Sequence, residues 1–133
     1  MIKVFQTIFD FKNGNCFQAC VASVLELPLE DVPNFCAEDQ DEWLRNYNEW
    51  LRPRGLGVIH VITDACSDSN IIISEFTAGY HIAGVEPTKG EKHAVVIHNG
   101  IIVHDPHPRQ NAFKLPIIDI QLFTVQEPWK VKT

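Results

Sequence analysis

Three residue types that together perform nucleophilic catalysis occur in this chain at positions where local structure can activate them. Cys16 follows a Gly-containing turn and opens an apolar segment, and the N-terminus of a helix favours thiolate over thiol. His93 precedes an apolar run, and Asp105 follows the next run along the chain. A thiolate, an imidazole base and a carboxylate that orients the imidazole are the parts of an activated cysteine nucleophile. This trio is therefore the main candidate for chemistry.

The other three cysteines lack such surroundings. Cys20 lies one helical turn after Cys16 among small apolar residues and is expected in the core, whereas Cys36 and Cys66 stand in loop-like stretches with no activating neighbour. The sequence has no CxxC pair, and a chain with an adequate core has no need of a disulfide framework. We expect free thiols in a cytoplasmic protein.

The segment KHAVVIHNGIIVHDPHP, residues 92–108, decides whether His93 and Asp105 can meet. A two-residue turn at Asn99-Gly100 would point them to opposite faces, whereas a three-residue loop with a bulge at Gly100 would place them opposite each other. The apolar pattern fits both registers, but a His93 oriented by Asp105 requires the three-residue loop, which we predict. The remaining histidines of the segment are then expected in the turn and on the surface: His98, His104 and His107.

Two helices in the first half of the chain are predicted from the spacing of apolar residues. The first begins at Cys16, is capped by Asn15 and ends at Pro28. The second covers residues 38–52 and has an apolar stripe that includes Trp43 and Trp50. These tryptophans are expected to cover the sheet, and the alternative is that one of them lines a substrate groove.

Strands are predicted in the second half, after an extended lead-in over residues 2–9. The strand-like runs are 56–62, 71–76, 80–85, 92–98, 101–105 and about 117–125. Helices followed by strands, without βαβ alternation, indicate an α+β domain with an antiparallel sheet.

Length and composition limit the class of protein further. The 133 residues fit a single domain over 1–133, and 45% hydrophobic with 21% charged residues is typical of a globular chain. The net charge of −6 with scattered Lys and Arg argues against nucleic acid as a partner. No apolar run reaches the ~20 residues of a membrane span, and Gln6, Thr7 and Asp10 interrupt the N-terminal segment where a signal peptide would be apolar.

Two blocks, NCFQACVASVLELPLEDVPNF and HAVVIHNGIIVHDPHP, resemble the papain-like superfamily, in particular the small bacterial and phage cysteine peptidases of the bacteriocin-processing type. In those proteins the nucleophile opens a helix, and an H-x-V-V strand and an x-D-P strand supply the other two residues. The resemblance covers about a third of the chain and implies a papain-like fold, in which N-terminal helices pack on an antiparallel sheet.

By position, the resemblance makes Cys16 the nucleophile, His93 the general base and acid, and Asp105 the residue that fixes the imidazole tautomer. The family also has an upstream glutamine whose side-chain amide joins the cysteine N–H in the oxyanion hole. Gln6 is the only upstream glutamine, and its longer separation from Cys16 requires the turn KNGN, residues 12–15, to loop out.

The implied activity is hydrolysis of a peptide or amide bond in a peptide or protein substrate, through a thioester and without cofactor or metal. The same triad would also serve an acyltransferase or a deamidase. A third possibility is an inhibitor or immunity-type protein that binds through its groove without turnover. His104 and His107 offer a metal site as a further alternative. The sequence does not determine the oligomeric state.

Overall fold

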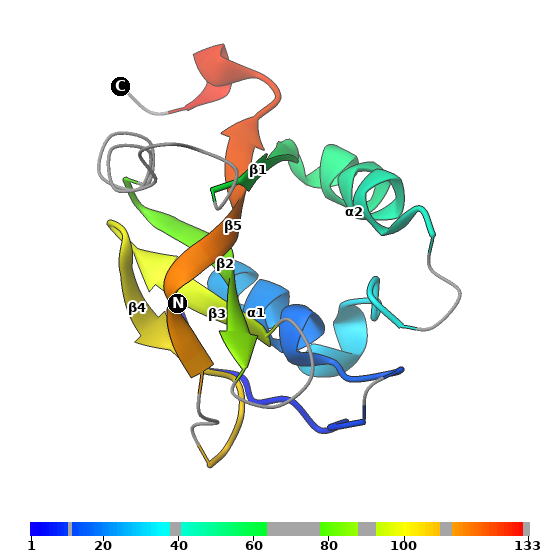
Figure 1. Ribbon diagram of the computed structural model, residues 1–133. Helices are drawn as coiled ribbons and strands as arrows, with labels where there is room; N and C mark the ends of the chain where they lie inside the picture. Colours follow the sequence, from blue (N-terminus) through cyan, green and yellow to red (C-terminus); the bar gives the residue numbers. More distant parts are fainter. Residues whose placement is uncertain (11, 38–40, 64–77, 88–92, 110–112, 132–133) are drawn as a thin grey trace.

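The computed structural model describes residues 1–10, 12–37, 41–63, 78–87, 93–109 and 113–131 (Figure 1). Its α-helices are α1 (Cys16–Leu25) and α2 (Trp43–Leu51). Its strands are β1 (Leu56–Ile62), β2 (Tyr80–Pro87), β3 (His93–His98), β4 (Ile101–His104) and β5 (Phe113–Val125). Single turns of 3-10 helix are η1 (Leu29–Asp31), η2 (Arg52–Arg54) and η3 (Pro128–Lys130). The predicted α+β class with an antiparallel sheet is confirmed.

The five strands form one sheet in the order β1-β5-β2-β3-β4, and every neighbouring pair is antiparallel. Strand β5 begins at Phe113, earlier than the predicted start near residue 117, and it pairs with both β1 and β2. The predicted strand at 71–76 lies outside the described residues. Because β5 comes last in the chain but lies inside the sheet, the N- and C-terminal halves fold as one unit.

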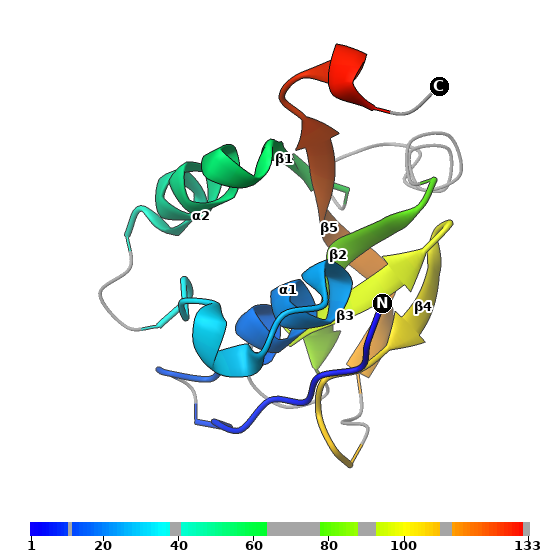
Figure 2. The same cartoon turned by 180° about the vertical axis from the view of Figure 1, so that it is seen from behind.

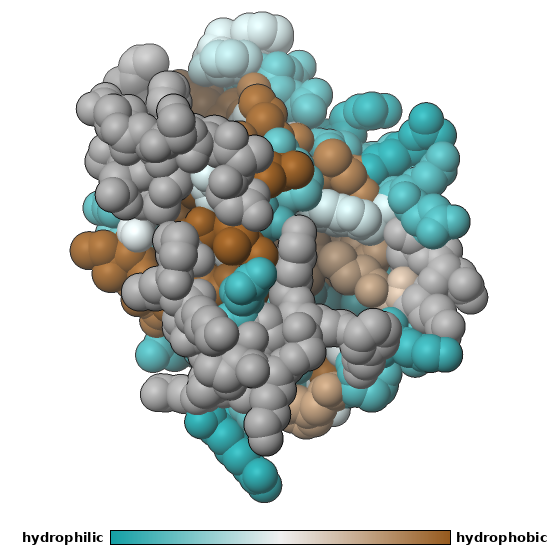
Figure 3. Space-filling view, viewed as in Figure 1, coloured by the Kyte–Doolittle hydropathy of each residue, from teal (hydrophilic) through white to brown (hydrophobic). Residues whose placement is uncertain are grey.

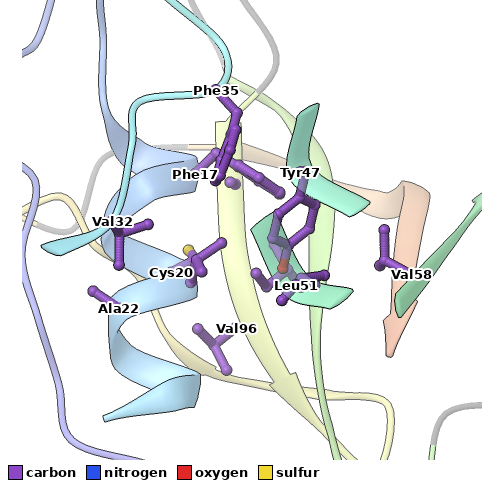
Figure 4. Close-up of a cluster of buried hydrophobic side chains, with 12 residues drawn as sticks. Phe17, Cys20, Ala22, Val32, Phe35, Tyr47, Leu51, Val58 and Val96 are labelled. Carbon is purple, nitrogen blue, oxygen red and sulfur yellow. The ribbon is translucent and has the colours of Figure 1, made fainter. Parts of the chain in front are cut away.

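Both helices lie on the same side of the sheet, with α1 over β2 and β3 and α2 beside β1 (Figure 2). A core of buried side chains fills the space between them (Figure 4). It consists of Phe17, Cys20, Val21, Ala22, Val32, Phe35, Tyr47, Leu51, Val58, Ile82, Ala94 and Val96. The expected core position of Cys20 is confirmed, since its side chain has no exposed surface.

The opposite face of the sheet carries a second buried cluster, because side chains alternate along each strand. It contains Ala83, Val85, Val95, Ile97, Ile117 and Ile120. Figure 3 views this side of the molecule, where hydrophobic and hydrophilic side chains both reach the surface. Strand β3 is therefore apolar on both faces, which is why its sequence pattern alone could not fix the register of the hairpin.

The second helix is shorter than the predicted range of 38–52. It begins at Trp43, after a turn at Asp41 and Glu42, and ends where Pro53 and the left-handed Gly55 shape η2; residues 38–40 lie outside the described part of the chain. Its apolar stripe faces the core as expected. Tyr47 is fully buried, and Trp43 packs half-buried against the core cluster.

Candidate active site

Cys16 is the first residue of α1 and is partly exposed. The first intrahelical hydrogen bond runs from the N–H of Ala19 to the carbonyl of Asn15, at 3.0 Å. The N–H groups of the first helical turn therefore have no partner within the helix, and the positive end of the helix dipole lies at Cys16. This position suits a thiolate and an oxyanion next to it.

Asn15 occupies the N-cap position, but the prediction that its side chain caps the helix is wrong. Its Oδ1 accepts hydrogen bonds from the backbone N–H groups of Thr7 and Ile8, at 2.9 and 2.8 Å, and its Nδ2 donates to the Thr7 hydroxyl at 3.0 Å. The N-terminal segment lies beside the helix start. Its backbone N–H groups therefore donate to the Asn15 side-chain oxygen, in place of the N–H groups of the helix. Asn15 is buried and fastens this segment beside Cys16.

The chain between Ile8 and Asn15 loops out as the resemblance required. The Asn15 N–H donates to the Ile8 carbonyl at 3.2 Å, which closes the loop. Inside the loop, Asp10 Oδ1 accepts the N–H groups of Lys12 and Asn13, at 3.1 and 2.8 Å. A Cβ at Gly14 would approach the Asp10 carbonyl oxygen to 2.7 Å, so this turn needs glycine.

Gln6 is brought to the site by this loop and is buried. Its Nε2 donates to the Ile8 carbonyl at 3.1 Å, the same oxygen that accepts the Asn15 N–H, so the amide group lies next to the residue that precedes Cys16. The Gln6 backbone N–H donates to the Pro106 carbonyl at 2.9 Å, directly after Asp105. Gln6 thus connects the two halves of the candidate site, and the second N–H of its amide can serve an oxyanion.

His93 and Asp105 are in contact, as predicted. His93 Nε2 lies 2.6 Å from Asp105 Oδ1, and both side chains are more than nine-tenths buried. The backbone N–H of His107 donates to the same oxygen at 2.9 Å. Because an ionised carboxylate only accepts hydrogen bonds, Nε2 carries a proton, and the other ring nitrogen, Nδ1, is left for a different partner.

The second partner of the His93 side chain is Cys16, and the hydrogen bond between them is one of the contacts that raise the pKa of His93. The three candidate residues are therefore brought together in the order thiol, imidazole and carboxylate. Cys16 comes from the start of α1, His93 from the start of β3 and Asp105 from the residue after β4. Three separate elements converge on one end of the sheet.

The charges of this trio stabilise one another. Burial alone lowers the pKa of His93, but hydrogen bonds to Asp105 and Cys16, and the negative charges of both, outweigh it and raise the pKa to about 9. Burial alone raises the pKa of Asp105, but hydrogen bonds from His93 and from the His107 N–H, with the positive charge of His93, lower it below its usual value. The site therefore holds a proton on His93 next to the Asp105 carboxylate.

The loop that connects the two strands differs from the prediction. His98 pairs with Ile101, so the turn contains only two residues, Asn99 and Gly100, with φ of 51° and 81°. Two consecutive left-handed residues form the type I′ turn, whose twist matches that of the strands. The Asn99 side chain also accepts the Gly79 N–H at 2.8 Å, which holds the turn against the start of β2. The predicted three-residue loop is wrong.

A β-bulge further along the hairpin restores the contact that the two-residue turn would have prevented. Ile97 pairs with Ile102, but Val96 pairs with His104, so Val103 is an extra residue on β4. Continued by one residue, this register places Asp105 on the same face as His93. The expected side-chain contact is present although the loop predicted to produce it is absent.

The other histidines near the hairpin have structural partners. His104 is buried, not a surface residue, and its Nε2 lies 2.7 Å from the Val4 carbonyl, where it fastens the N-terminal segment. His98 stacks on Tyr80, and His107 Nδ1 accepts the Arg109 N–H at 3.1 Å. Within the described part of the chain, no group of three or more His, Cys, Asp or Glu could hold a metal ion.

Two features of the site were missed by sequence reasoning. The attachment of Asn15 to Thr7 and Ile8 has no local signal, because the partners are seven and eight residues apart and belong to an irregular segment. The bond from the His107 N–H to Asp105 is different, since an aspartate that accepts the N–H two residues later is a recognised turn pattern. The Asp-Pro-His sequence could have suggested it.

Comparisons of the chain with protein-family models, with curated proteins and with solved structures find no match. Among the described residues, no helix has the length and apolar character needed to cross a membrane. The functional interpretation therefore depends on the geometry of the site.

Proposed function

We propose that this protein is a thiol hydrolase that cleaves a peptide or amide bond, with Cys16 as nucleophile, His93 as general base and acid, and Asp105 as the group that orients the imidazole. The supporting observation is the continuous hydrogen-bonded path from Cys16 through His93 to Asp105, at a helix N-terminus. The order of the three residues along the chain, and their placement at the start of a helix, at the start of a strand and directly after a second strand, agree with a papain-like fold, which is part of this proposal.

The chemistry follows from these contacts. His93 takes the thiol proton of Cys16 as Sγ attacks the substrate carbonyl carbon, and the oxyanion that forms accepts hydrogen bonds from the Cys16 N–H and from Gln6 Nε2. His93 gives its proton to the leaving nitrogen as the C–N bond breaks, which leaves a thioester on Cys16. Water then attacks the thioester carbonyl, a proton passes to His93, and the acid product and the free thiol are released. No step needs a cofactor.

Formation of the thioester can be tested without knowing the natural substrate. With p-nitrophenyl acetate, we expect a burst of p-nitrophenolate and an acetyl group on Cys16, located by peptide mass mapping. Cys16→Ala should remove both signals, and His93→Ala should slow acylation about 10²–10⁴-fold, the usual contribution of a general base.

Two variants serve as matched controls. Cys20→Ala changes a core cysteine, and His98→Ala changes a histidine beside the turn, so both should retain the burst. Acetylation spread over several cysteines, or a rate that does not depend on His93, contradicts the proposal. Thermal unfolding of each variant separates loss of chemistry from loss of fold.

The partner in the second half-reaction distinguishes hydrolysis from acyl transfer. We propose water as acceptor and a peptide or protein as donor, so incubation with a peptide mixture in water enriched in oxygen-18 should place the label in new C-terminal carboxylates. Products that carry an added amine in place of the label would identify an acyltransferase with the same triad.

A further inference from the structure

A second imidazole–carboxylate pair lies on the helix-covered face of the sheet, separate from the triad. His60 Nε2 of β1 lies 3.1 Å from Asp119 Oδ2 of β5. The Asp119 side chain is only 7% exposed, whereas the His60 side chain is 22% exposed and reaches solvent. The pair therefore presents an imidazole to the surface with a buried carboxylate behind it.

The middle of the sheet is shaped to hold this carboxylate. Gly84 of β2 pairs with Asp119, and a Cβ at Gly84 would collide with Asp119 Oδ1. Holding β1 in the sheet does not require the pair, because β1 and β5 already pair continuously from Leu56 to Ile62. A buried carboxylate is costly to desolvate unless it is paired, and His60 provides Asp119 with a partner that reaches solvent.

Contacts between aromatic rings connect this pair with the nucleophile. The Trp43 ring packs edge-to-face against His60 with centroids 5.4 Å apart, and it packs in the same way against Phe17 at 5.6 Å. Phe17 directly follows Cys16. Two ring contacts therefore connect the pair with the start of α1.

The side chains at this surface favour the binding of a positively charged group. Because the carboxylate only accepts, His60 donates from Nε2 to Asp119, which leaves Nδ1 for another partner. The negative charge of Asp119 and the electron-rich face of the half-buried Trp43 both attract a positive group. We propose that His60, Asp119 and Trp43 form a substrate-binding subsite beside Cys16, which receives the guanidinium or ammonium group of a basic side chain near the bond to be cleaved. This inference rests on the proposed function.

Two alkylating reagents of the same shape test the subsite. N-(4-guanidinobutyl)bromoacetamide and N-(4-ureidobutyl)bromoacetamide both transfer their acetamide carbon to Cys16 Sγ with loss of bromide, and only the first carries a positive charge. At one fixed pH, we expect the guanidinium reagent to modify Cys16 about tenfold faster than the urea reagent. The measured quantity is the ratio of the two rates, so it does not depend on how reactive Cys16 itself is.

Three variants locate the origin of the preference. Asp119→Asn and His60→Gln should each bring the rate ratio to within about twofold of one. Asp31→Asn removes the same charge at an exposed position and should leave the ratio unchanged. If Asp119→Asn strongly lowers the midpoint of thermal unfolding, the rate ratio measured in His60→Gln tests the subsite.

The outcomes separate this inference from the proposed function. Equal rates for both reagents in the wild-type protein overturn the subsite, as does a preference that survives both subsite variants or one that disappears in Asp31→Asn. Those results do not contradict the proposed triad, provided that iodoacetamide modifies Cys16 more slowly in His93→Ala than in the wild-type protein. If that dependence is missing, the proposed function itself fails.

Discussion

The Asn15 side chain fastens the N-terminal segment to the start of α1 through three hydrogen bonds. In Asn15→Ala, the N–H groups of Thr7 and Ile8 lose their acceptor in a partly buried position. We expect the free energy of unfolding to fall by about 2–3 kcal/mol, measured by urea denaturation. Asn13→Ala is the matched control, because this exposed side chain should change stability by less than about 0.5 kcal/mol. Similar values for both variants would refute the role of Asn15.

Asp105 sets the protonation of His93 through the hydrogen bond between them. Asp105→Asn removes the negative charge but keeps the size of the side chain, so the pKa of His93 should fall below its value of about 9. An NMR titration of the His93 ring protons measures this pKa directly. Asp31→Asn, which removes an exposed charge outside the triad, should leave the titration unchanged. A His93 pKa that does not move in Asp105→Asn would rule out the assigned pairing.

At the scale of elements, the bulge in β4 determines which way Asp105 points. Without the bulge, Val103 would pair with Val96 and Asp105 would point away from His93. Deleting Val103 removes the extra residue and keeps His104 opposite Val96, so Asp105 stays on the face of His93 and the variant should retain acetylation of Cys16. Inserting one alanine after Val103 should direct Asp105 to the other face, and we expect acetylation to fall at least about 10²-fold, because the imidazole loses the group that orients it. Full activity in a folded insertion variant, or its loss in a folded deletion variant, would show that this register does not position Asp105.

The hairpin also shows what the sequence could predict at this scale and what it could not. The Asn-Gly pair correctly indicated a tight turn, and the chemistry of His93 and Asp105 correctly indicated that their side chains meet. The β-bulge that brings the two side chains together could not be predicted from the sequence. A bulge changes which face a side chain occupies without a sequence signal, since β3 buries apolar residues on both faces. Val103 is as suitable for a regular strand as for a bulge.

At the scale of the whole molecule, local periodicity predicted the helices and most strands, but not the contacts between distant segments. The strand order places the last strand, β5, between β1 and β2, and no local pattern encodes such a pairing. His104 looked like a surface residue because its partner, the Val4 carbonyl, lies 100 residues away. Gln6 reaches the site for a similar reason, through the Pro106 carbonyl. The candidate triad was identifiable from residue types, whereas its supports come from tertiary structure.

The stability of the whole molecule should depend on pH through His93. Its pKa is about 9 in the folded chain and about 6.5 in an unfolded one, so the folded chain binds the proton more tightly. The stabilisation is complete below about pH 6.5 and is lost as pH rises through 9, where the free energy of unfolding should fall by up to about 3 kcal/mol. Urea denaturation between pH 6 and 10 measures this fall.

His93→Gln should make the fall smaller, because the variant has no proton to lose at this position, while the buried Cys20 and Tyr47, whose pKa values burial raises, still contribute near the alkaline end. Asp105 acts in a different window, since its lowered pKa contributes stability that disappears only as the pH falls into the acidic range. The loss of stability due to His93 at alkaline pH and the loss due to Asp105 at acidic pH can therefore be measured separately. A wild-type protein as stable at pH 9.5 as at pH 6.5, or a fall of the same size in His93→Gln, would show that His93 does not hold its proton between Cys16 and Asp105.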